Sequence, residues 1–318
     1  MTTSAFPGLD PSPRQPGRTM RAAHIMAQDI PNTQIVAPRE LVEAAFARGS
    51  SPSASARKAI ALMLHKAAGD AWEPGKLFSI PMSELRSSHK GNGRLRDALD
   101  EVQRTLIRIE TLSPAGKHAI ESAPILTRRI DETDPGGLVW FQFSEAARLA
   151  LQGSEHYAVL NRAVVLAFES RYSVTLYERG AWLCGRQHDR VWRGTVPQLR
   201  EILGVPEKAY RNWTELRRNT LDLAVPEVDQ LGHFTTTVSE TRRGRQVVGV
   251  TLAFAPKRPP EREAAERELA APRAGRKARR KDQVQPDLLD PPTRLALTAL
   301  KEGRDPPGAA KLKTRNDN

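Results

Sequence analysis

The amino-acid sequence predicts an α+β protein that contains two copies of one unit and is flanked by disordered tails. Two helices followed by a β-hairpin can be recognised twice along the chain, and the second copy repeats the spacing of the first. The chain has 318 residues, enough for two ordinary domains with tails. We therefore expect two tandem domains related by internal duplication.

Composition indicates the kind of partner. The formal net charge is +12 and the isoelectric point is near 10.2, which is unusual for a metabolic enzyme. Such a charge favours a polyanion, first of all nucleic acid, although a ribosomal-type or membrane-surface protein would satisfy it as well. The single cysteine, Cys184, excludes an internal disulfide framework and fits a reducing cytosol. No apolar run approaches the about 18 residues of a membrane span and no signal core is found, so we predict a cytoplasmic protein.

Both ends of the chain are predicted to be disordered. Residues 1–30 are rich in Pro, Ser and Gly, and residues 256–318 combine charge and proline with few aromatic residues. Within the second tail, the basic run RAGRKARRKD at 273–282 is either a solvated segment or a nonspecific phosphate contact. The two bodies between the tails then span residues 31–155 and 156–255.

In the first body, residues 53–69 have the apolar spacing of a helix, and KLFSI reads as a short strand. The segment beginning PMSELRSS then predicts a helix, a Gly- and Asn-containing break, and a second helix with an apolar stripe from Leu95 to Ile109 that includes Leu106. The segment APILTRRIDETDPGGLVWFQFS predicts a hairpin with its turn at DPGG.

The second body repeats this order. A helix is predicted within residues 161–186; Gly180 costs it about 1 kcal/mol, so it is expected to bend or to end early. Helix, break at Gly204–Pro206 and helix follow, and then a hairpin with the tip RRGR. One strand of that hairpin is expected to place Val248 on the same face as three later apolar residues. These residues are Val250, Leu252 and Phe254.

A constant offset of 114 residues superimposes the two copies without a gap. The matched pairs include Leu85 and Leu199, Leu99 and Trp213, Ile107 and Leu221, Arg94 and Lys208, Glu101 and Glu215, and Arg104 and Arg218. Agreement of apolar and charged positions together indicates duplication. Helix, helix and hairpin is the order of a winged helix, so we predict two tandem winged-helix domains.

The second copy offers the stronger DNA-binding candidates. In EKAYRNWTELRRNTLDLA (207–224), taken as one helix, the residues expected toward the core are Ala209, Trp213, Leu216, Thr220 and Leu223. The opposite face would then present Lys208, Arg211, Asn212, Glu215, Arg218 and Asn219. A helix fits the major groove, where Arg recognises guanine and Asn adenine; Glu215 would accept from cytosine or pair with a neighbouring arginine. The alternative is a charged face that only meets solvent.

The hairpin tips and the first copy complete the candidate set. The tip RRGR supplies Arg242, Arg243 and Arg245 as phosphate contacts. From the first copy the candidates are Arg94, Arg96, Arg104 and Arg108, with Arg128 and Arg129 lower in the hairpin arm. The first tip, DETDPGG, is acidic, so we expect the first wing to stay off the DNA or to contact a protein, and the second copy to dominate sequence reading.

The sequence from residue 160 to 255 resembles the iteron-binding plasmid replication initiators, the Rep family with paired winged helices. The residues that carry the resemblance are Ser170, Tyr172, Leu176, Tyr177 and Glu178, then Leu199, Arg200, Leu203 and Gly204, then Tyr210, and Gly244 with Arg245. Residues 35–155 resemble the family by pattern more than by motif. The basic tail is not part of the family core.

The resemblance implies a bacterial, plasmid-associated protein without a catalytic step. Such proteins bind tandem repeats at a plasmid origin as monomers, promote its opening, and recruit the host initiator and the replicative helicase. Their dimers often repress their own promoter, so a monomer–dimer equilibrium is expected. The second winged helix usually carries most of the base reading.

Two other functions fit parts of the sequence. A DNA-nicking enzyme is disfavoured because the seven histidines include no His–x–His pair, and the sequence has no glycine-rich phosphate loop and no Cys/His cluster. We therefore expect no catalytic residues, no metal and no cofactor. A winged-helix transcriptional regulator without a replication role would bind DNA with the same surfaces, and only the family resemblance favours the initiator.

Overall fold

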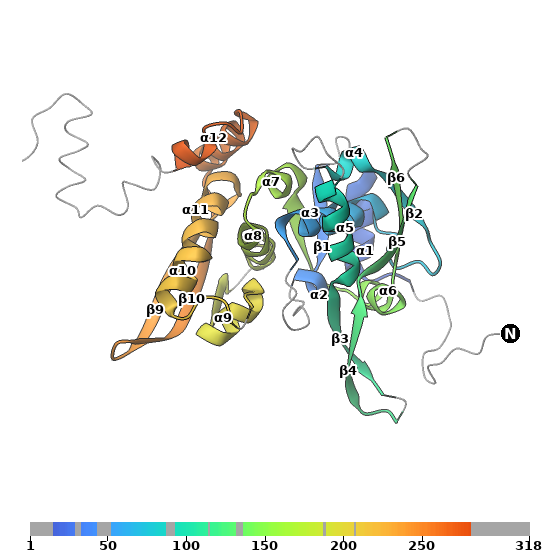
Figure 1. Cartoon of the computed structure of the whole chain (residues 1–318), viewed down its shortest axis with the longest axis horizontal. Coiled ribbons are helices and arrows are strands. Elements are labelled where there is room, and N and C mark those ends of the chain that lie inside the picture. Colours follow the sequence, from blue (N-terminus) through green and yellow to red (C-terminus); the bar gives the residue numbers. More distant parts are fainter. Residues whose placement is uncertain are drawn as a thin grey trace, which may run out of the picture. The chain divides into compact units, whose positions relative to one another are not determined.

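The computed structural model describes residues 15–28, 33–42, 52–86, 93–113, 115–131, 136–186, 189–206 and 208–280. The chain forms two compact units, Met1–Leu269 and Ala270–Asn318, and the elements below belong to the first unit apart from the last residue of its final helix. Figure 1 shows their order along the chain. None of the described helices is both long and apolar enough to cross a membrane, and the described residues hold no cluster of metal-ligating side chains.

The first winged helix is built on the predicted helix, strand and hairpin. Its elements are α3 (Ala54–Ala67), β2 (Phe78–Pro81), α4 (Met82–Leu85), α5 (Gly93–Arg104), β5 (Leu126–Asp131) and β6 (Leu138–Phe143). Ser53 caps α3 by accepting a hydrogen bond from the Ala56 backbone N–H. The three strands pair antiparallel in the order β2-β6-β5, and Leu99, Leu126 and Phe141 are fully buried between sheet and helices.

The predicted second helix of this unit is too long. The helix α5 ends at Arg104, and Leu106 and Ile109 lie instead on strand β3 (Leu106–Leu112), which pairs with β4 (His118–Pro124). β-Branched residues at every second position from Thr105 to Thr111 favour a strand over a helix, which explains the error. The resulting hairpin extends from the body of the first winged helix (Figure 1), and it interrupts the offset of 114, because Ile107 is in a strand and Leu221 in a helix.

The second winged helix repeats the first. Its elements are α8 (Arg171–Cys184), β8 (Val191–Thr195), α9 (Val196–Leu203), α10 (Trp213–Asn219), α11 (Leu221–Leu231), β9 (Phe234–Arg243) and β10 (Gln246–Pro256). Thr195 and Gln198 form a reciprocal capping box at the start of α9, and Gly204, with φ +62°, ends that helix. The strand order β8-β10-β9 is equivalent to β2-β6-β5, so the predicted fold of two winged helices is confirmed.

Residues 207–224 do not form one helix. Residue 207 lies outside the described residues, and Tyr210 has a left-handed backbone with φ +58°, so α10 starts only at Trp213, after the cap Asn212. The backbone breaks again at Thr220, where α11 begins. The new helix axis turns Leu223 outward, and its exposure of 53% contradicts its predicted place in the core.

A β-bulge corrects the predicted face of the second hairpin. The pairing of β9 and β10 shifts between Val247 and Gly249. This shift buries Val247 and leaves Val248 exposed, whereas Val250, Leu252 and Phe254 are buried as predicted.

Further elements join the two winged helices and extend into the predicted tails. They are α1 (Arg18–Gln28), β1 (Gln34–Pro38), α2 (Arg39–Val42), α6 (Glu145–Gln152), β7 (Tyr157–Asn161), α7 (Arg162–Ala167) and α12 (Pro259–Ala270). The helices α1 and α12 contradict the prediction of disorder for their residues, since Met20 and Ala265 are buried. Within the predicted tails, residues 1–14, 29–30 and 281–318 lie outside the described residues. The boundary at 155/156 stays a prediction, and β1 pairs with β7 across it.

The helix α8 lies at the centre of the second core. It runs unbroken from Arg171 to Cys184, which contradicts the expected bend at Gly180. The rings of Phe234 and Phe254 pack directly on the backbone at Gly180: a Cβ atom there would lie 2.8 Å from Cδ1 of Phe254 and closer still to the ring of Phe234. Tyr177 stacks on Phe234 at 5.6 Å between ring centroids. Glycine is therefore required for close packing and not for a bend.

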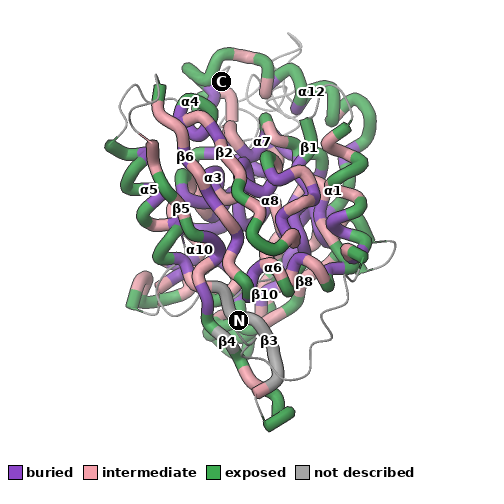
Figure 2. Tube along the Cα trace, turned by 90° about the vertical axis from the view of Figure 1, so that its right-hand side faces the viewer, coloured by how far each residue is buried: buried purple, intermediate pink, exposed green. Residues whose placement is uncertain are grey.

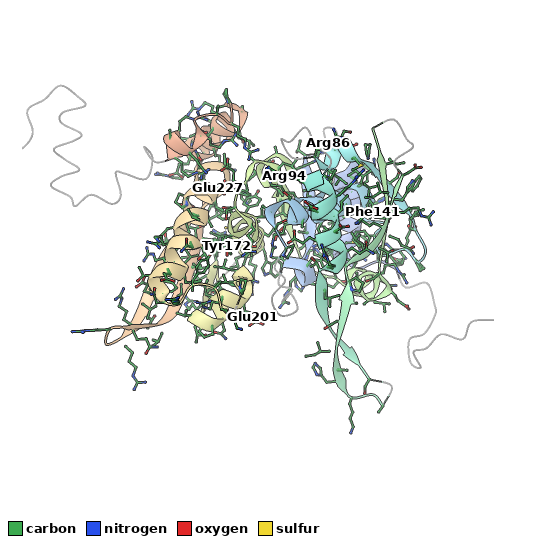
Figure 3. The ribbon with its side chains drawn as sticks, in the orientation of Figure 1. Arg86, Arg94, Phe141, Tyr172, Glu201 and Glu227 are labelled. Carbon is green, nitrogen blue, oxygen red and sulfur yellow. The ribbon has the colours of Figure 1, made fainter. Side chains whose placement is uncertain are left out.

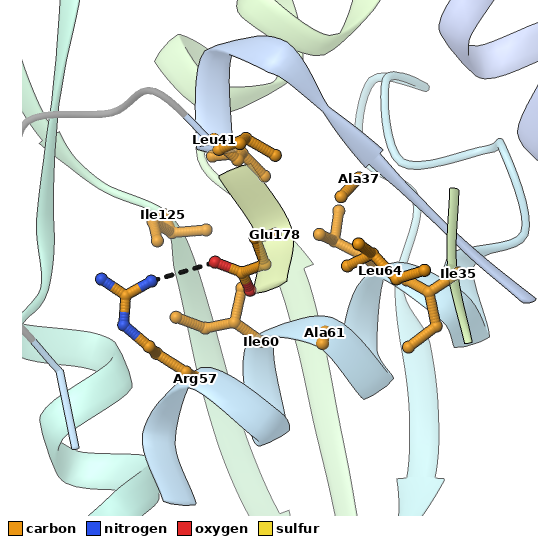
Figure 4. Close-up of a pocket in the computed structure, with 11 residues that line it drawn as sticks. Ile35, Ala37, Leu41, Arg57, Ile60, Ala61, Leu64, Ile125 and Glu178 are labelled. Carbon is orange, nitrogen blue, oxygen red and sulfur yellow. Dashed lines mark hydrogen bonds and ion pairs between the residues drawn. The ribbon is translucent and has the colours of Figure 1, made fainter. Parts of the chain in front are cut away.

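The helices α3 and α8 are buried over most of their lengths (Figure 2). Between them, Arg57 and Glu178 form an ion pair with 3.1 Å between Nη1 and Oε2, at the edge of a small apolar pocket (Figure 4). Burial lowers the pKa of Arg57 and raises that of Glu178, and the charge of each partner opposes the effect. Lys58 donates to the carbonyls of Leu166 and Phe168 near the end of α7. Polar contacts thus join α3 of the first winged helix to α7 and α8.

We predict that Gly180→Ala destabilises the protein by about 1–3 kcal/mol, although alanine favours a helix, because the added methyl overlaps both phenyl rings. Urea denaturation followed by circular dichroism measures this. Gly153→Ala is the matched control: Gly153 has φ −81°, and its added Cβ would meet only the Leu149 carbonyl, at 3.7 Å. Equal stability of the two variants would contradict the packing argument.

Candidate nucleic-acid interface

The turn between α9 and α10 is fixed by one arginine. Arg200 donates from Nη1 to the Ala209 carbonyl at 2.7 Å and from Nη2 to the Tyr210 carbonyl. The Tyr210 hydroxyl lies 3.4 Å from that of Tyr172 on α8. The left-handed backbone at Tyr210 is thus held from both sides, and it places the exposed side chain of Arg211 directly before α10.

Three predicted DNA-binding residues stabilise α10. The Asn212 side chain accepts a hydrogen bond from the Glu215 backbone N–H at 2.9 Å. The Glu215 carboxylate accepts one from the Arg211 N–H, also at 2.9 Å, and Asn219 donates to the Glu215 carbonyl at 2.8 Å. These contacts make capping and helix stabilisation the local role of Asn212, Glu215 and Asn219. Among the predicted candidates of this copy, Lys208, Arg211 and Arg218 are exposed basic side chains.

A carboxylate between α10 and the wing joins the two elements. Glu240 on β9 accepts hydrogen bonds from Trp213 Nε1 and from Arg217 Nη1, both at 2.7 Å, and from Arg242 Nη2 at 2.6 Å. Its side chain is only 12% exposed. Burial would raise the Glu240 pKa, but the three donors outweigh it, and the pKa lies below its ordinary value. Glu240 therefore sets the position of the wing relative to α10.

A groove lies between the start of α9, the start of α10 and the wing tip. The described residues that line it include no acidic side chain and four arginines, which are Arg200, Arg211, Arg242 and Arg245. At the tip, Gly244 takes φ +62°, and long side chains extend from this hairpin (Figure 3). The predicted tip residue Arg243 is exposed beside them. The groove therefore combines a helix N-terminus and a basic hairpin, as a polyanion-binding surface requires.

The first copy is less open to a polyanion. Arg94, Arg96 and Arg104 are exposed on α5, and Arg129 is exposed on β5. Arg128 instead pairs with Asp100 and donates to the Leu99 carbonyl, with a side chain that is 11% exposed, so it holds β5 against α5. Arg108 lies in β3, and its side chain is not described; tip residues 132–135 also lie outside the described residues.

Sequence reasoning missed the residues that position this interface. Glu240, Arg217 and Arg200 were not predicted to act there, and Trp213 was expected only as a core residue. One signal was present: Glu240 is an isolated acid two residues before the basic tip, where a buried carboxylate needs cationic partners. The sequence contains no comparable signal for Arg200, whose acceptors depend on the shape of the turn.

Known proteins share both halves of this architecture. The family described as "Initiator Replication protein, WH1" matches residues 34–180, and "Initiator Rep protein, WH2" matches residues 195–254. No curated protein matches the sequence. Among solved structures, the chain is similar to a crystal structure of selenomethionine derivatives of domains 2 and 3 of RctB. That similarity has a TM-score of 0.35 and 9% identity, and it covers 64% of this chain and 79% of the other.

We predict that Glu240→Gln lowers the free energy of unfolding at neutral pH, because the neutral amide loses the charge that Arg217 and Arg242 bind. Because the Glu240 pKa is lowered in the folded protein, the stability that this carboxylate contributes is complete above the ordinary pKa of 4.5. It is lost as the pH falls through the lowered value. The difference from the unsubstituted protein should therefore shrink below pH 4.5 in urea titrations. Glu201→Gln, at an exposed carboxylate of α9, is the control, and a difference independent of pH would contradict this role.

Proposed function

Because this chain belongs to the family of initiator Rep proteins with two winged helices, a family of non-catalytic DNA-binding replication initiators, we propose that it binds duplex DNA at repeated sites of a plasmid origin and starts replication there. The observation that carries the proposal is the arginine-lined groove between α10 and the wing tip. A surface with four arginines and no acidic lining residue attracts phosphates from any sequence. Sequence recognition needs the helix as well.

The geometry supports a division of work within the second winged helix. The short α10 enters the major groove, where Arg211 and Arg218 contact base edges and Lys208 a phosphate. The wing places Arg242, Arg243 and Arg245 along the sugar–phosphate backbone. Glu240 holds both parts in one geometry before DNA arrives, so less ordering is needed on binding.

The first winged helix adds a weaker contact. Its exposed arginines Arg94, Arg96, Arg104 and Arg129 meet phosphates of the same site, while Arg128 stays with Asp100. Two tandem winged helices on one chain suit directly repeated sites. Such sites are not palindromes, so they do not call for a symmetric protein dimer. Opening of the origin, recruitment of the host initiator and helicase, repression of its own gene by a dimer, and action in the bacterial cytoplasm belong to the same proposal, supported by the family alone. A regulator without a replication role would use the same DNA surfaces, and the family membership favours the initiator.

We predict that Arg211→Ala or Arg218→Ala weakens binding to the cognate repeat by ~1–3 kcal/mol if the side chain reads a base. Each variant should also support replication of a plasmid that lacks its own initiator less well than the unsubstituted protein supplied in trans. Lys66→Ala, on the exposed side of α3, is the control. Unchanged affinity for these variants together with a collapse for Arg94→Ala would reverse our ranking of the two winged helices. Failure of the unsubstituted protein to support replication would favour the regulator.

Removing Arg242, Arg243 and Arg245 together should lower affinity for all duplexes alike, because these side chains are placed on phosphates. The slope of log K against log salt should become shallower by about 0.9 for each phosphate that the wing no longer neutralises. Fluorescence anisotropy at several salt concentrations measures both effects on cognate and random duplexes. An unchanged slope would show that the wing tip does not touch the backbone.

A further inference from the structure

A second basic groove lies outside the interface described above. It lies between the start of α1, the β1–β7 ribbon and the C-terminal end of α8. Three exposed arginines, Arg18, Arg39 and Arg186, line it. It shares no lining residue with the groove at the wing tip, so the proposed duplex site does not account for it.

Two of these guanidinium groups lie on one indole ring. Cζ of Arg39 is 5.8 Å from the centroid of Trp182, and Cζ of Arg186 is 5.9 Å from it. The His156 ring meets the same indole edge to face at 5.8 Å. Cation–π contact with one ring holds these two like charges close together, and guanidinium groups suit planar recognition of phosphate oxygens.

The charge of the groove is unbalanced. Among its described lining residues, Glu155 is the single carboxylate against three guanidinium groups, and it accepts a hydrogen bond from the Arg18 backbone N–H at 3.3 Å. Burial, together with the nearby charges of Lys257 and Arg262, lowers the pKa of His233, so this imidazole is neutral at neutral pH. An anion that enters the groove would therefore meet a net positive field.

One residue that lines the groove also has a hydrogen-bond donor without an acceptor in the described part of the chain. The indole N–H of Trp182 is buried and has no hydrogen-bond partner among the described residues. A buried donor without an acceptor is costly. An acceptor oxygen that reached this N–H would remove that cost.

We propose that this groove binds the phosphate groups of nucleotides, separately from the duplex held by α10 and the wing. The nucleotides come from either of two sources, a single-stranded nucleic acid or a free nucleoside triphosphate. The exposed His156 and the half-buried Tyr157 favour a nucleotide over an acidic peptide, because a base stacks on such rings and a carboxylate side chain does not.

The test compares two double variants of the full chain. Arg39→Gln/Arg186→Gln removes both cations on Trp182, and Lys66→Gln/Lys117→Gln removes the same charge from exposed positions outside the groove. Anisotropy of a labelled oligothymidylate of about 20 nucleotides should show at least ~10-fold weaker binding for the first variant than for the second. Its salt slope should be shallower by about 1.4, because two phosphates of the single strand are no longer neutralised. Equal binding by the two variants overturns the proposal.

Further measurements identify the source of the phosphate. If ATP alone binds to the unsubstituted protein and not to the groove variant, the ligand of the groove is a free nucleotide. If ATP does not bind but oligothymidylate binds and depends on the two arginines, the ligand of the groove is a single-stranded nucleic acid. Displacement of the oligonucleotide by polyglutamate at equal charge concentration overturns the preference for phosphate. Arg39→Lys/Arg186→Lys keeps the charge without the planar fork, and it should bind with intermediate affinity even if the glutamine variant folds poorly.

The proposed nucleotide groove and the proposed duplex-binding function can be refuted independently of each other. The groove variant should keep the affinity of the lysine control for duplex repeats, and the wing variant lacking Arg242, Arg243 and Arg245 should keep its affinity for oligothymidylate. Loss of both activities in the groove variant, with its thermal unfolding unchanged, would show one continuous site and overturn the separate groove.

Discussion

The packing of two phenyl rings on the backbone of α8 is the constraint on which the second winged helix depends. Phe234 and Phe254, from β9 and β10, occupy the space that a side chain at position 180 would need. This packing brings the wing sheet against the helix that also contacts α11 and, through Glu178, the Arg57 side chain of α3. One glycine thus lets a single helix serve the wing, the following helices and the neighbouring winged helix.

The interface is then positioned by polar contacts that use two of its own arginines. Arg200 uses its guanidinium group to bind backbone carbonyls of the turn, and Glu240 is shared by Trp213, Arg217 and Arg242. Net positive charge alone would not align a helix with a wing, because like charges repel. A partly buried carboxylate between them supplies the needed attraction.

Sequence and structure differ where local pattern and tertiary contact compete. Leu106 and Ile109 continue the apolar spacing of α5, yet they pair in β3 because β-branched neighbours favour a strand and β4 is available. The segment 207–224 was predicted as one helix, but the chain turns at Tyr210 and makes Asn212 the cap of α10. Val248 would alternate inward in a regular strand, and the bulge reverses it. Each error lies at a break in regular structure, where periodicity carries no information.

The sequence by itself determined the fold class, the internal duplication and the choice of the second copy as the more basic one, because apolar periodicity, turn residues and charge are local properties of the chain. Tertiary structure alone decided which polar side chains act in capping and bridging and which remain outside. Asn212 thereby became the cap of α10, Arg128 was held against α5, and Glu240, Arg217 and Arg200 were placed around the interface. It also brought Arg18, Arg39 and Arg186 to one groove. Hydrogen bonds and ion pairs between distant residues depend on distances of a few ångströms, which no spacing along the chain encodes.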